Sequence, residues 1–231
     1  MSKKLSKRFY KTVSVEAEGA GFVVKLDQYT LRTPGKKPLV FTRKDHAQYV
    51  ADEWDAQVEN VRPETMSCTR LYNVVVERTP ETREAIIGEG VKYSSTDVIC
   101  YREGGGTALS RYQTEQWDPI LKWANDFGIE LASTDSLIAT DAAPSTLVFL
   151  KTYLEKRDDL NLTLAVHFIA TLGSVVLGIA VLEKHLSAKE AFRLSRLDEL
   201  WQIAQWGEVD DAKDRADEIE AELVALARLL E

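Results

Sequence analysis

Cysteine and histidine are scarce in this chain of 231 residues. Its two cysteines, Cys68 and Cys100, are too few for a disulfide framework and are typical of free, buried thiols in a reducing compartment. Its three histidines, His46, His167 and His185, lack the spacing at which histidines share a metal ion. The sequence therefore predicts neither a disulfide-stabilised secreted fold nor a metal site, and His167 is interpreted as a core histidine with one hydrogen bond.

The chain also lacks an excess of positive charge, because its 37 acidic residues outnumber its 29 lysines and arginines and give a net charge of −8. A nucleic-acid role is disfavoured, since no basic stripe would neutralise phosphates. The first ten residues, MSKKLSKRFY, are not followed by the apolar run of a secretory signal and are too short for an organelle-targeting peptide. We therefore expect a protein of the bacterial cytoplasm, or a chain from which a targeting segment has already been removed.

Common catalytic motifs are absent from the sequence. It contains no Gly-x-Ser-x-Gly nucleophile elbow, no dinucleotide-binding fingerprint and no phosphate-binding loop. The glycine run at 104–106 lacks the Gly-Lys-Ser/Thr ending that such a loop needs, so it is interpreted as a linker. Two alternatives stay open at this point: a soluble enzyme that uses Cys68 or Cys100 as its nucleophile, and a generic protein-binding adaptor.

The composition is that of a folded globular protein, with 45% hydrophobic and 29% charged residues. In the first forty residues, aromatic and β-branched side chains alternate with polar ones between turn residues. This pattern predicts four short strands, at residues 9–15, 22–26, 29–32 and 39–41. We therefore predict an α+β protein, with a small antiparallel β domain over residues 1–41 and a larger helical domain over residues 42–231.

One stretch, Leu162–Leu182, carries no formally charged side chain, although the residues on both sides of it are highly charged. A helix that is apolar on all sides must be surrounded by other helices or by lipid. Its length of about 20 residues would just cross a bilayer, but polar residues interrupt it, among them Thr163, His167 and Ser174. We therefore predict one central buried helix in the helical domain, with a membrane anchor as the alternative.

A helix is predicted to begin near Thr42, a candidate N-cap with Asp45 three residues later. Helical spacing would then place Val50, Trp54 and Val58 on one buried face. Core packing is the preferred interpretation of Trp54, so this tryptophan is expected to be structural.

A second helix start is predicted at Asp118, because Asp118 and Pro119 have the residue types of an N-cap and a first helical residue. The preceding helix is expected to end at Trp117. We predict structural roles for both neighbours: Trp117 in the core, and Asp118 as the cap.

A third start is predicted at Ser187, where Ser187 and Glu190 form a capping box for a helix that runs to Trp206. The inward face of that helix would consist of Leu194, Leu197, Trp201 and Ala204. Its polar residues are Arg193, Arg196, Asp198, Glu199, Gln202 and Gln205. At 100° per residue, at least one of Asp198 and Glu199 should point outward, and a solvated helix face with local ion pairs is the simplest interpretation of this set.

Several short motifs occur in an order that resembles one known family. They are Arg8-Phe9-Tyr10-Lys11, Leu31-Arg32-Thr33-Pro34, Glu53-Trp54-Asp55-Ala56-Gln57, Thr96-Asp97-Val98-Ile99-Cys100-Tyr101-Arg102, Gln116-Trp117-Asp118-Pro119 and Leu194-Ser195-Arg196-Leu197-Asp198-Glu199 with Gln202 and Trp206-Gly207. The ordered set, from residue 8 to residue 212, resembles the ATP-twelve family. These proteins are assembly chaperones of the catalytic head of F-type ATP synthase, in mitochondria and alphaproteobacteria.

The resemblance implies a β unit followed by helices, no enzymatic activity and no cofactor. It implies that the partner is the free α subunit of the ATP synthase, held through a surface that the β subunit later occupies. The functional acid of the family motif falls on Asp198 or Glu199, and the expected partner-binding residues are Asp198, Glu199, Arg196, Gln202 and Trp206. Gln28 stands where the family usually has glycine, which leaves the turn type of that hairpin open, and no role is carried over beyond Ala212.

Overall fold

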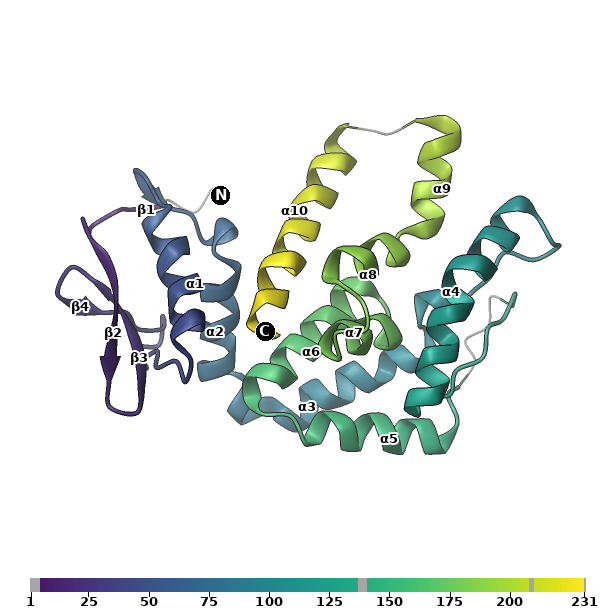
Figure 1. Ribbon diagram of the computed structural model, residues 1–231, viewed down its shortest axis with the longest axis horizontal. Helices are drawn as coiled ribbons and strands as arrows, with labels where there is room; N and C mark the ends of the chain where they lie inside the picture. Colours follow the sequence, from purple (N-terminus) through teal and green to yellow (C-terminus); the bar gives the residue numbers. More distant parts are fainter. Residues whose placement is uncertain (1–4, 137–140, 208–209, 231) are drawn as a thin grey trace. The chain divides into compact units, whose positions relative to one another are not determined.

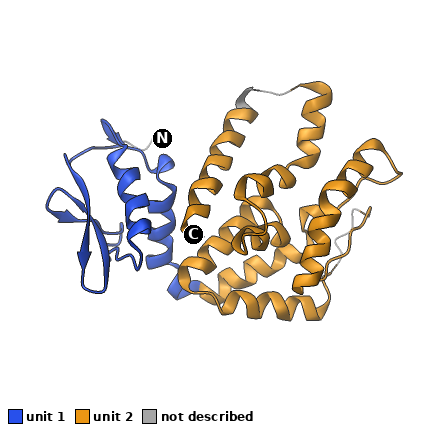
Figure 2. Ribbon diagram, in the orientation of Figure 1, with its two compact units in different colours: residues 1–82 blue, residues 83–231 orange. Residues whose placement is uncertain are grey.

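The computed structural model describes residues 5–136, 141–207 and 210–230. The chain forms two compact units, unit 1 over residues 1–82 and unit 2 over residues 83–231 (Figure 2). The sequence-based boundary between residues 41 and 42 is corrected by this division, because it separates strands from helices inside unit 1. The first helix packs on the preceding sheet, which makes strands and helix one unit.

Unit 1 contains a three-stranded antiparallel sheet in the order β2-β3-β4 (Figure 1). Its strands are β2 (Val13–Glu18), β3 (Gly21–Leu26) and β4 (Tyr29–Thr30). A separate ribbon pairs β1 (Ser6–Lys7) with β5 (Asn60–Val61) in antiparallel register. The predicted segment at 39–41 forms no strand, although Phe41 makes an isolated bridge to Phe22.

The turn between β3 and β4 is left-handed at Asp27, where φ is 53°. Aspartate tolerates this conformation, and its carboxylate accepts hydrogen bonds from the backbone N–H groups of Lys11 at 3.0 Å and Thr12 at 2.9 Å. These hydrogen bonds hold the pKa of Asp27 below its ordinary value. Gln28 does not adopt a positive φ, so the hairpin does not require a glycine at that position.

Two α-helices complete unit 1, α1 (Lys44–Asp55) and α2 (Ser67–Glu77), with a 3₁₀ turn, η1 (Pro63–Thr65), between them. Helix α1 packs against β2, β3 and α2. The apolar core of unit 1 includes Val23, Val24, Leu39, Phe41, Ala47, Val50 and Met66.

Two sequence expectations for α1 are wrong. The N-cap position is Arg43 rather than Thr42, and no side chain caps it; Asp45 instead accepts a hydrogen bond from the Arg43 side chain at 3.0 Å. Val58 is 82% exposed. Because α1 ends at Asp55, the helical spacing that would have buried Val58 does not extend to it.

Unit 2 is built from helices (Figure 1). They are α3 (Thr79–Lys92), α4 (Ala108–Phe127), α5 (Pro144–Glu155), α6 (Asp159–Leu172), α7 (Val175–Leu182), α8 (Ala188–Ser195), α9 (Leu197–Trp206) and α10 (Asp210–Ala227), with 3₁₀ turns η2 (Tyr93–Ser95), η3 (Val98–Cys100) and η4 (Arg228–Leu230). Helix α3 begins in unit 1, and its backbone leaves helical geometry at Thr82, where the two units divide.

The predicted single helix over Leu162–Leu182 is wrong, because this run forms α6 and α7. Gly173 takes the left-handed conformation that ends α6, with φ of 62°. The Ser174 side chain then caps α7 by accepting a hydrogen bond from the N–H of Leu177 at 3.0 Å. Gly173 and Ser174, which the prediction placed inside one helix, therefore mark the end of α6 and the start of α7.

Burial of the run is confirmed most clearly in α7, where all eight residues are buried. A Cβ atom at Gly178 would lie 2.7 Å from the backbone nitrogen of Ile169 on α6, so this close approach of the two helices requires glycine. Among the described residues, no helix is both long enough and apolar enough to span a membrane.

The predicted helix break at Asp118 is also wrong, because α4 continues through it to Phe127. Pro119 lies on the exposed side of α4, where its ring faces solvent, while Trp117, Ile120 and Leu121 are buried. Burial of this face outweighs the lost backbone hydrogen bond at the proline. Asp118 is therefore not an N-cap.

Candidate functional site

The segment from Ser187 to Trp206 forms two helices rather than the single predicted one. Ser187 caps α8 as expected, since its Oγ accepts a hydrogen bond from the N–H of Glu190 at 3.1 Å. The backbone leaves helical geometry at Arg196, with φ of −109° and ψ of 20°, and α9 begins at the next residue. Because this break changes the helical phase, the expected inward position of Ala204 is wrong, and Ala204 is exposed.

Trp117 of α4 holds the end of α8 in place. Its ring is fully buried, and its indole N–H donates a hydrogen bond to the carbonyl oxygen of Leu194 at 2.9 Å. The last carbonyl groups of a helix have no partner inside the helix, so this bond satisfies one of them in the core. The position of the α8–α9 junction is therefore fixed from α4.

The Arg102 guanidinium lies over the Trp117 ring, 4.7 Å from its centroid. It donates hydrogen bonds to the carbonyl oxygen of Gln113 at 3.1 Å and to the carboxylate of Asp118 at 3.0 Å. Burial lowers the pKa of Arg102, and the negative charge of Asp118 opposes this shift. Asp118 thus lies in an ion pair that holds the loop before α4 against α4.

Asp198, one of the two candidate acids, is half-buried and faces α4. Its carboxylate accepts a hydrogen bond from the side-chain amide of Gln113 at 2.8 Å. Gln113 is itself buried, and its amide oxygen accepts the N–H of Glu103 at 2.8 Å. Gln113 is not among the predicted site residues, because its only signal in the sequence is its place one helical turn before Trp117. Asp198 therefore links α9 to α4.

Glu199 is the outward-pointing acid, as the helical phase predicted for at least one of the pair. Its carboxylate accepts two hydrogen bonds from the Arg196 guanidinium, at 2.6 and 2.7 Å, which lower the pKa of Glu199. Arg196 in turn lies over the Phe192 ring, 5.3 Å from its centroid. Glu199 directly follows Asp198 in the chain, but this bidentate ion pair lies on the solvent-facing side of α9.

Helix α9 exposes apolar side chains. Trp206 is 79% exposed and Leu200 is 36% exposed, while Ile203 between them is half-buried. These residues are three apart and therefore neighbours along one stripe of the helix. Trp201 turns to the other side and packs against Tyr112 of α4, with ring centroids 5.5 Å apart. The polar residue Gln202 is exposed.

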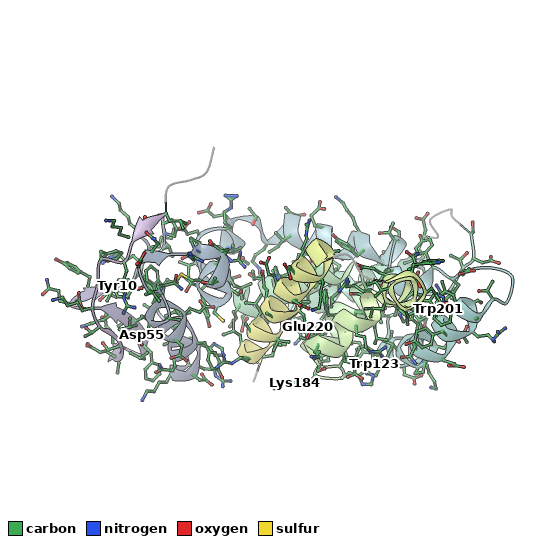
Figure 3. The ribbon with its side chains drawn as sticks, turned by 90° about the horizontal axis from the view of Figure 1, so that it is seen from above. Tyr10, Asp55, Trp123, Lys184, Trp201 and Glu220 are labelled. Atoms are coloured by element: carbon green, nitrogen blue, oxygen red, sulfur yellow. The ribbon has the colours of Figure 1, made fainter. Side chains whose placement is uncertain are left out.

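A hollow of about 480 Å³ lies beside this stripe, between α8, α9 and α10. Figure 3 shows Trp201 on α9 and Glu220 on α10, the helices that flank it. Phe192 and Leu200 supply apolar lining. Its charged rim consists of Lys189, Glu190, Arg193, Arg196 and Glu220. Of the expected partner-binding residues, Arg196 lines this hollow, whereas Asp198 faces α4. The name "α9 surface" is used below for Arg196, Glu199, Leu200, Gln202 and Trp206.

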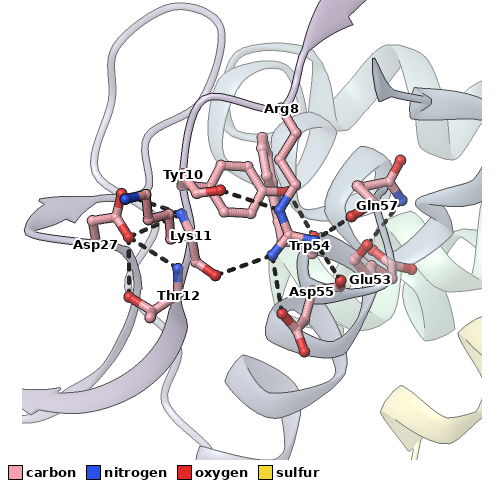
Figure 4. Close-up of polar contacts among 9 residues, drawn as sticks. All are labelled: Arg8, Tyr10, Lys11, Thr12, Asp27, Glu53, Trp54, Asp55 and Gln57. Atoms are coloured by element: carbon pink, nitrogen blue, oxygen red, sulfur yellow. Dashed lines mark hydrogen bonds and ion pairs between the residues drawn. The ribbon is translucent and has the colours of Figure 1, made fainter. Parts of the chain in front are cut away.

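The Arg8 and Glu53-to-Gln57 motifs meet in unit 1 (Figure 4). The Arg8 guanidinium donates hydrogen bonds to the carbonyl oxygens of Tyr10 at 3.2 Å and Asp55 at 2.9 Å, and also to that of Gln57. The Tyr10 hydroxyl donates to the carbonyl of Trp54 at 2.6 Å, and the two rings meet edge to face at 5.6 Å. Trp54, only half-buried, thus helps to join the N-terminal segment to the end of α1.

Glu53 performs the capping that no residue at the start of α2 provides. Its carboxylate accepts hydrogen bonds from the N–H groups of Cys68 at 2.6 Å and Thr69 at 2.8 Å. Burial raises the pKa of Glu53, although these N–H groups pull it in the opposite direction. A carboxylate at a helix N-terminus is favourable, so this motif residue stabilises unit 1.

The two cysteines do not have the environment of a nucleophile. Cys68 and Cys100 are both buried. Burial, together with the nearby charge of Asp97, raises the pKa of Cys100 to about 12. A reactive cysteine needs a lowered pKa, so the structure gives the enzyme alternative no support.

Asp97 itself is a buried structural acid. It accepts hydrogen bonds from the N–H of Ile99 at 3.3 Å and from the N–H of Val176, at the start of α7, at 3.0 Å. Burial nevertheless raises its pKa to about 6. Asp97 therefore holds the loop before α4 against the α6–α7 break. This structural role accounts for the aspartate in the motif that runs from Thr96 to Arg102.

Comparisons with known proteins agree with this architecture. A family model described as ATP12 chaperone protein matches residues 7–125. The chain belongs to the ATP12 chaperone family. Membership confirms the resemblance seen in the ordered motifs, and with it a role as a chaperone in ATP synthase assembly.

The relatives and solved structures that match this chaperone cover most of its length. A curated relative, the mitochondrial protein atp12 of Schizosaccharomyces pombe, is 22% identical over 222 residues, which cover 90% of this chain and 76% of that protein. The crystal structure of Atp12 from Paracoccus denitrificans is 32% identical, with a TM-score of 0.88 over 97% of both chains. An aspartate-to-lysine mutant of that Atp12p gives the same TM-score. A protein of Agrobacterium tumefaciens is 35% identical, with a TM-score of 0.91 over 98% of this chain and 85% of that one.

Proposed function

We propose that this chaperone binds the free α subunit of F-type ATP synthase and prevents its aggregation until the β subunit replaces it. An unassembled subunit exposes apolar, strand-edged surface that promotes aggregation. A chaperone that covers such surface needs an apolar patch with a charged rim and must be displaceable. No nucleotide site is needed for release, because a better partner suffices.

The observation that carries this proposal is the exposure of Trp206 at the end of a helix whose start is fixed. Tryptophan is enriched where proteins contact each other. Its contribution to the stability of its own fold comes from buried apolar area, so a tryptophan that faces water contributes little to that stability. The contacts of Trp117, Gln113 and Asp198 hold the first turn of α9, while Trp206 at the other end remains uncovered among the described residues. The α9 surface is therefore the proposed contact with the client.

The two candidate acids receive different roles in this proposal. Glu199 lies on the α9 surface and would meet a basic or amide group of the α subunit, in competition with its own Arg196. Asp198 acts through Gln113, by holding α9 at the angle that presents the surface. The proposed location is the cytoplasm if the chain is bacterial, like the matching structures from Paracoccus denitrificans and Agrobacterium tumefaciens, and the mitochondrial matrix if it is eukaryotic and already processed.

The experiment is an aggregation assay with purified α subunit, diluted from denaturant with and without the chaperone. We expect the chaperone to keep α soluble in a complex of the two chains, and added β subunit to release it. The matched control is the β subunit alone, which the chaperone should not keep soluble. Protection of β but not of α would overturn the proposal, and so would a complex with α that persists when β is added.

A further inference from the structure

The sheet of unit 1 is closed on one side and open on the other. Beyond β3 lie β4 and the bridge between Phe22 and Phe41. On the opposite side β2 forms the edge, and among the described residues it has β3 as its one neighbouring strand. Six residues, Val13–Glu18, pair with β3 without a bulge. A full-length strand thus ends the sheet.

The register shows which backbone groups face the open side. Phe22 exchanges hydrogen bonds with Phe41, and the carbonyl of Val24 accepts the N–H of Leu31, so the backbone groups of these β3 residues point away from β2. In an antiparallel pair, the residues opposite them must then direct their own N–H and C=O outward. These residues are Val15, opposite Val24, and Ala17, opposite Phe22. Thr12 accepts the N–H of Asp27, which gives Val13 the same outward orientation.

This edge carries only part of the usual protection. Natural edge strands are commonly short, bulged, or guarded by proline or charged side chains, lysine above all, and β2 contains neither proline nor lysine. Its charged residues are Glu16, which forms an ion pair with Lys25 of β3 at 2.7 Å, and the exposed Glu18. The edge is therefore acidic on one face and otherwise free to accept a strand.

The other face of the same edge offers a place for a large side chain. Ala17 is small and leaves its cross-strand neighbour Phe22 half-exposed. A shallow hollow of about 620 Å³ lies over Phe22, and its other lining residues belong to the start of α1: Arg43, Lys44, Asp45, Gln48 and Tyr49. A residue placed opposite Ala17 on an added strand would share this face and extend over Ala17 toward the hollow.

We propose that β2 accepts a strand of the client, an extended segment with a large apolar residue beside Ala17 and a basic residue beside Glu16 and Glu18. Main-chain hydrogen bonds at a sheet edge give affinity, and pockets for alternate side chains give specificity. The inference rests on the proposed function, because the client is the free α subunit. It adds a second contact, in unit 1, that is separate from the α9 surface.

A second copy of the chain fits this edge poorly. If two β2 strands paired through their outward residues, Val13, Val15 and Ala17 would face one another, and Glu16 and Glu18 of both copies would share one face. Four carboxylates would then gather without a compensating cation from the added strand. A basic segment of another protein removes this repulsion, so the charges of β2 favour the client over self-association.

Hydrogen exchange of single amides tests the proposal directly. In the complex with α subunit, the outward amides of Val15 and Ala17 should exchange at least about tenfold more slowly. The amides of Ser14 and Glu16, which already bond to β3, should change little and serve as internal controls. Unchanged exchange at Val15 and Ala17 in a formed complex would overturn the inference while leaving the proposed function intact.

A pair of variants gives the second test. Val15→Pro removes one outward N–H and no bond to β3, whereas Val15→Ala keeps that N–H and serves as the control. We expect about tenfold weaker capture of α subunit by Val15→Pro and near-normal capture by Val15→Ala, with β3 amides still protected in both. Equal capture by the two variants would contradict the inference. If the free chaperone forms dimers and Val15→Pro dissociates them, the occupant of the β2 edge is a second copy of the chain, and the inference is also overturned.

Discussion

The α6–α7 and α8–α9 pairs look alike in the sequence and differ in what their breaks accomplish. Each stretch of about twenty residues has a helical pattern, and each is divided in the middle, at Gly173–Ser174 and at Arg196. The first break lets α7 pack against α6 with all eight of its residues buried. The second directs α9 away from the core, so that Leu197 is its one buried residue. One break therefore builds the core, and the other builds a surface.

The largest expected difference between the two helix pairs is the loss of folding stability when an acidic residue replaces an apolar one. Val175→Asp should unfold unit 2 or destabilise it by several kcal/mol, because the new carboxylate would be buried beside Asp97. Leu200→Asp, on the α9 surface, should change stability by less than about 0.5 kcal/mol. Chemical denaturation of both variants measures the contrast, and similar losses for both would show that α9 belongs to the core.

The next contrast is between two tryptophans. Trp117→Ala should cost about 3–5 kcal/mol, because it opens a cavity, leaves the Leu194 carbonyl without its indole donor and removes the ring beneath Arg102. Trp206→Ala should leave the melting temperature near that of the wild type and reduce capture of α subunit. Calorimetry and the aggregation assay on the same preparations check both halves. A Trp206→Ala variant with full capture would remove Trp206 from the α9 surface.

A pH measurement sharpens the account of the first break. The pKa of Asp97 is about 6 in the folded protein, above its ordinary value of 3.8, so the folded state holds this proton when the unfolded state has lost it. Asp97 therefore contributes stability below about pH 4 that is lost as pH rises through about 6, with a slope of at most ~1.4 kcal/mol per pH unit. Asp97→Asn should lack this component. Identical pH profiles for the two proteins would contradict the assigned role.

The smallest expected effects separate the two acids of α9. Asp198→Lys should lower stability by about 1–3 kcal/mol, because it leaves the buried amide of Gln113 without its acceptor. Glu199→Lys removes a partly exposed ion pair with Arg196, which is worth no more than about 1 kcal/mol. In the capture assay Glu199→Lys should nevertheless lose activity, and Asp198→Asn, which can still accept from Gln113, should retain it. The reverse order would exchange the roles of the two acids.

Much of this arrangement could be predicted from the sequence, and the exceptions share a cause. The alternation of apolar and polar residues predicted β3 and β4, and the uncharged run Leu162–Leu182 predicted which residues form the core of the helical unit. The breaks at Gly173 and Arg196, and the continuity of α4 through Pro119, could not be read locally, because tertiary burial decided each of them. The same holds for Val58 and for the unit boundary at residue 82. The ordered motifs identified the family, although most of their residues, such as Arg8, Asp97 and Arg102, serve the fold.

The most direct test of the central claim is site-specific photo-crosslinking from α9. A photoreactive amino acid in place of Trp206 should form an adduct with the α subunit in the chaperone complex. The adduct should disappear when the β subunit is added. The same probe at the exposed Lys122 of α4 is the matched control and should give no adduct. A complex that forms without any adduct from position 206, or with equal adducts from both positions, would contradict the claim that α9 contacts the client.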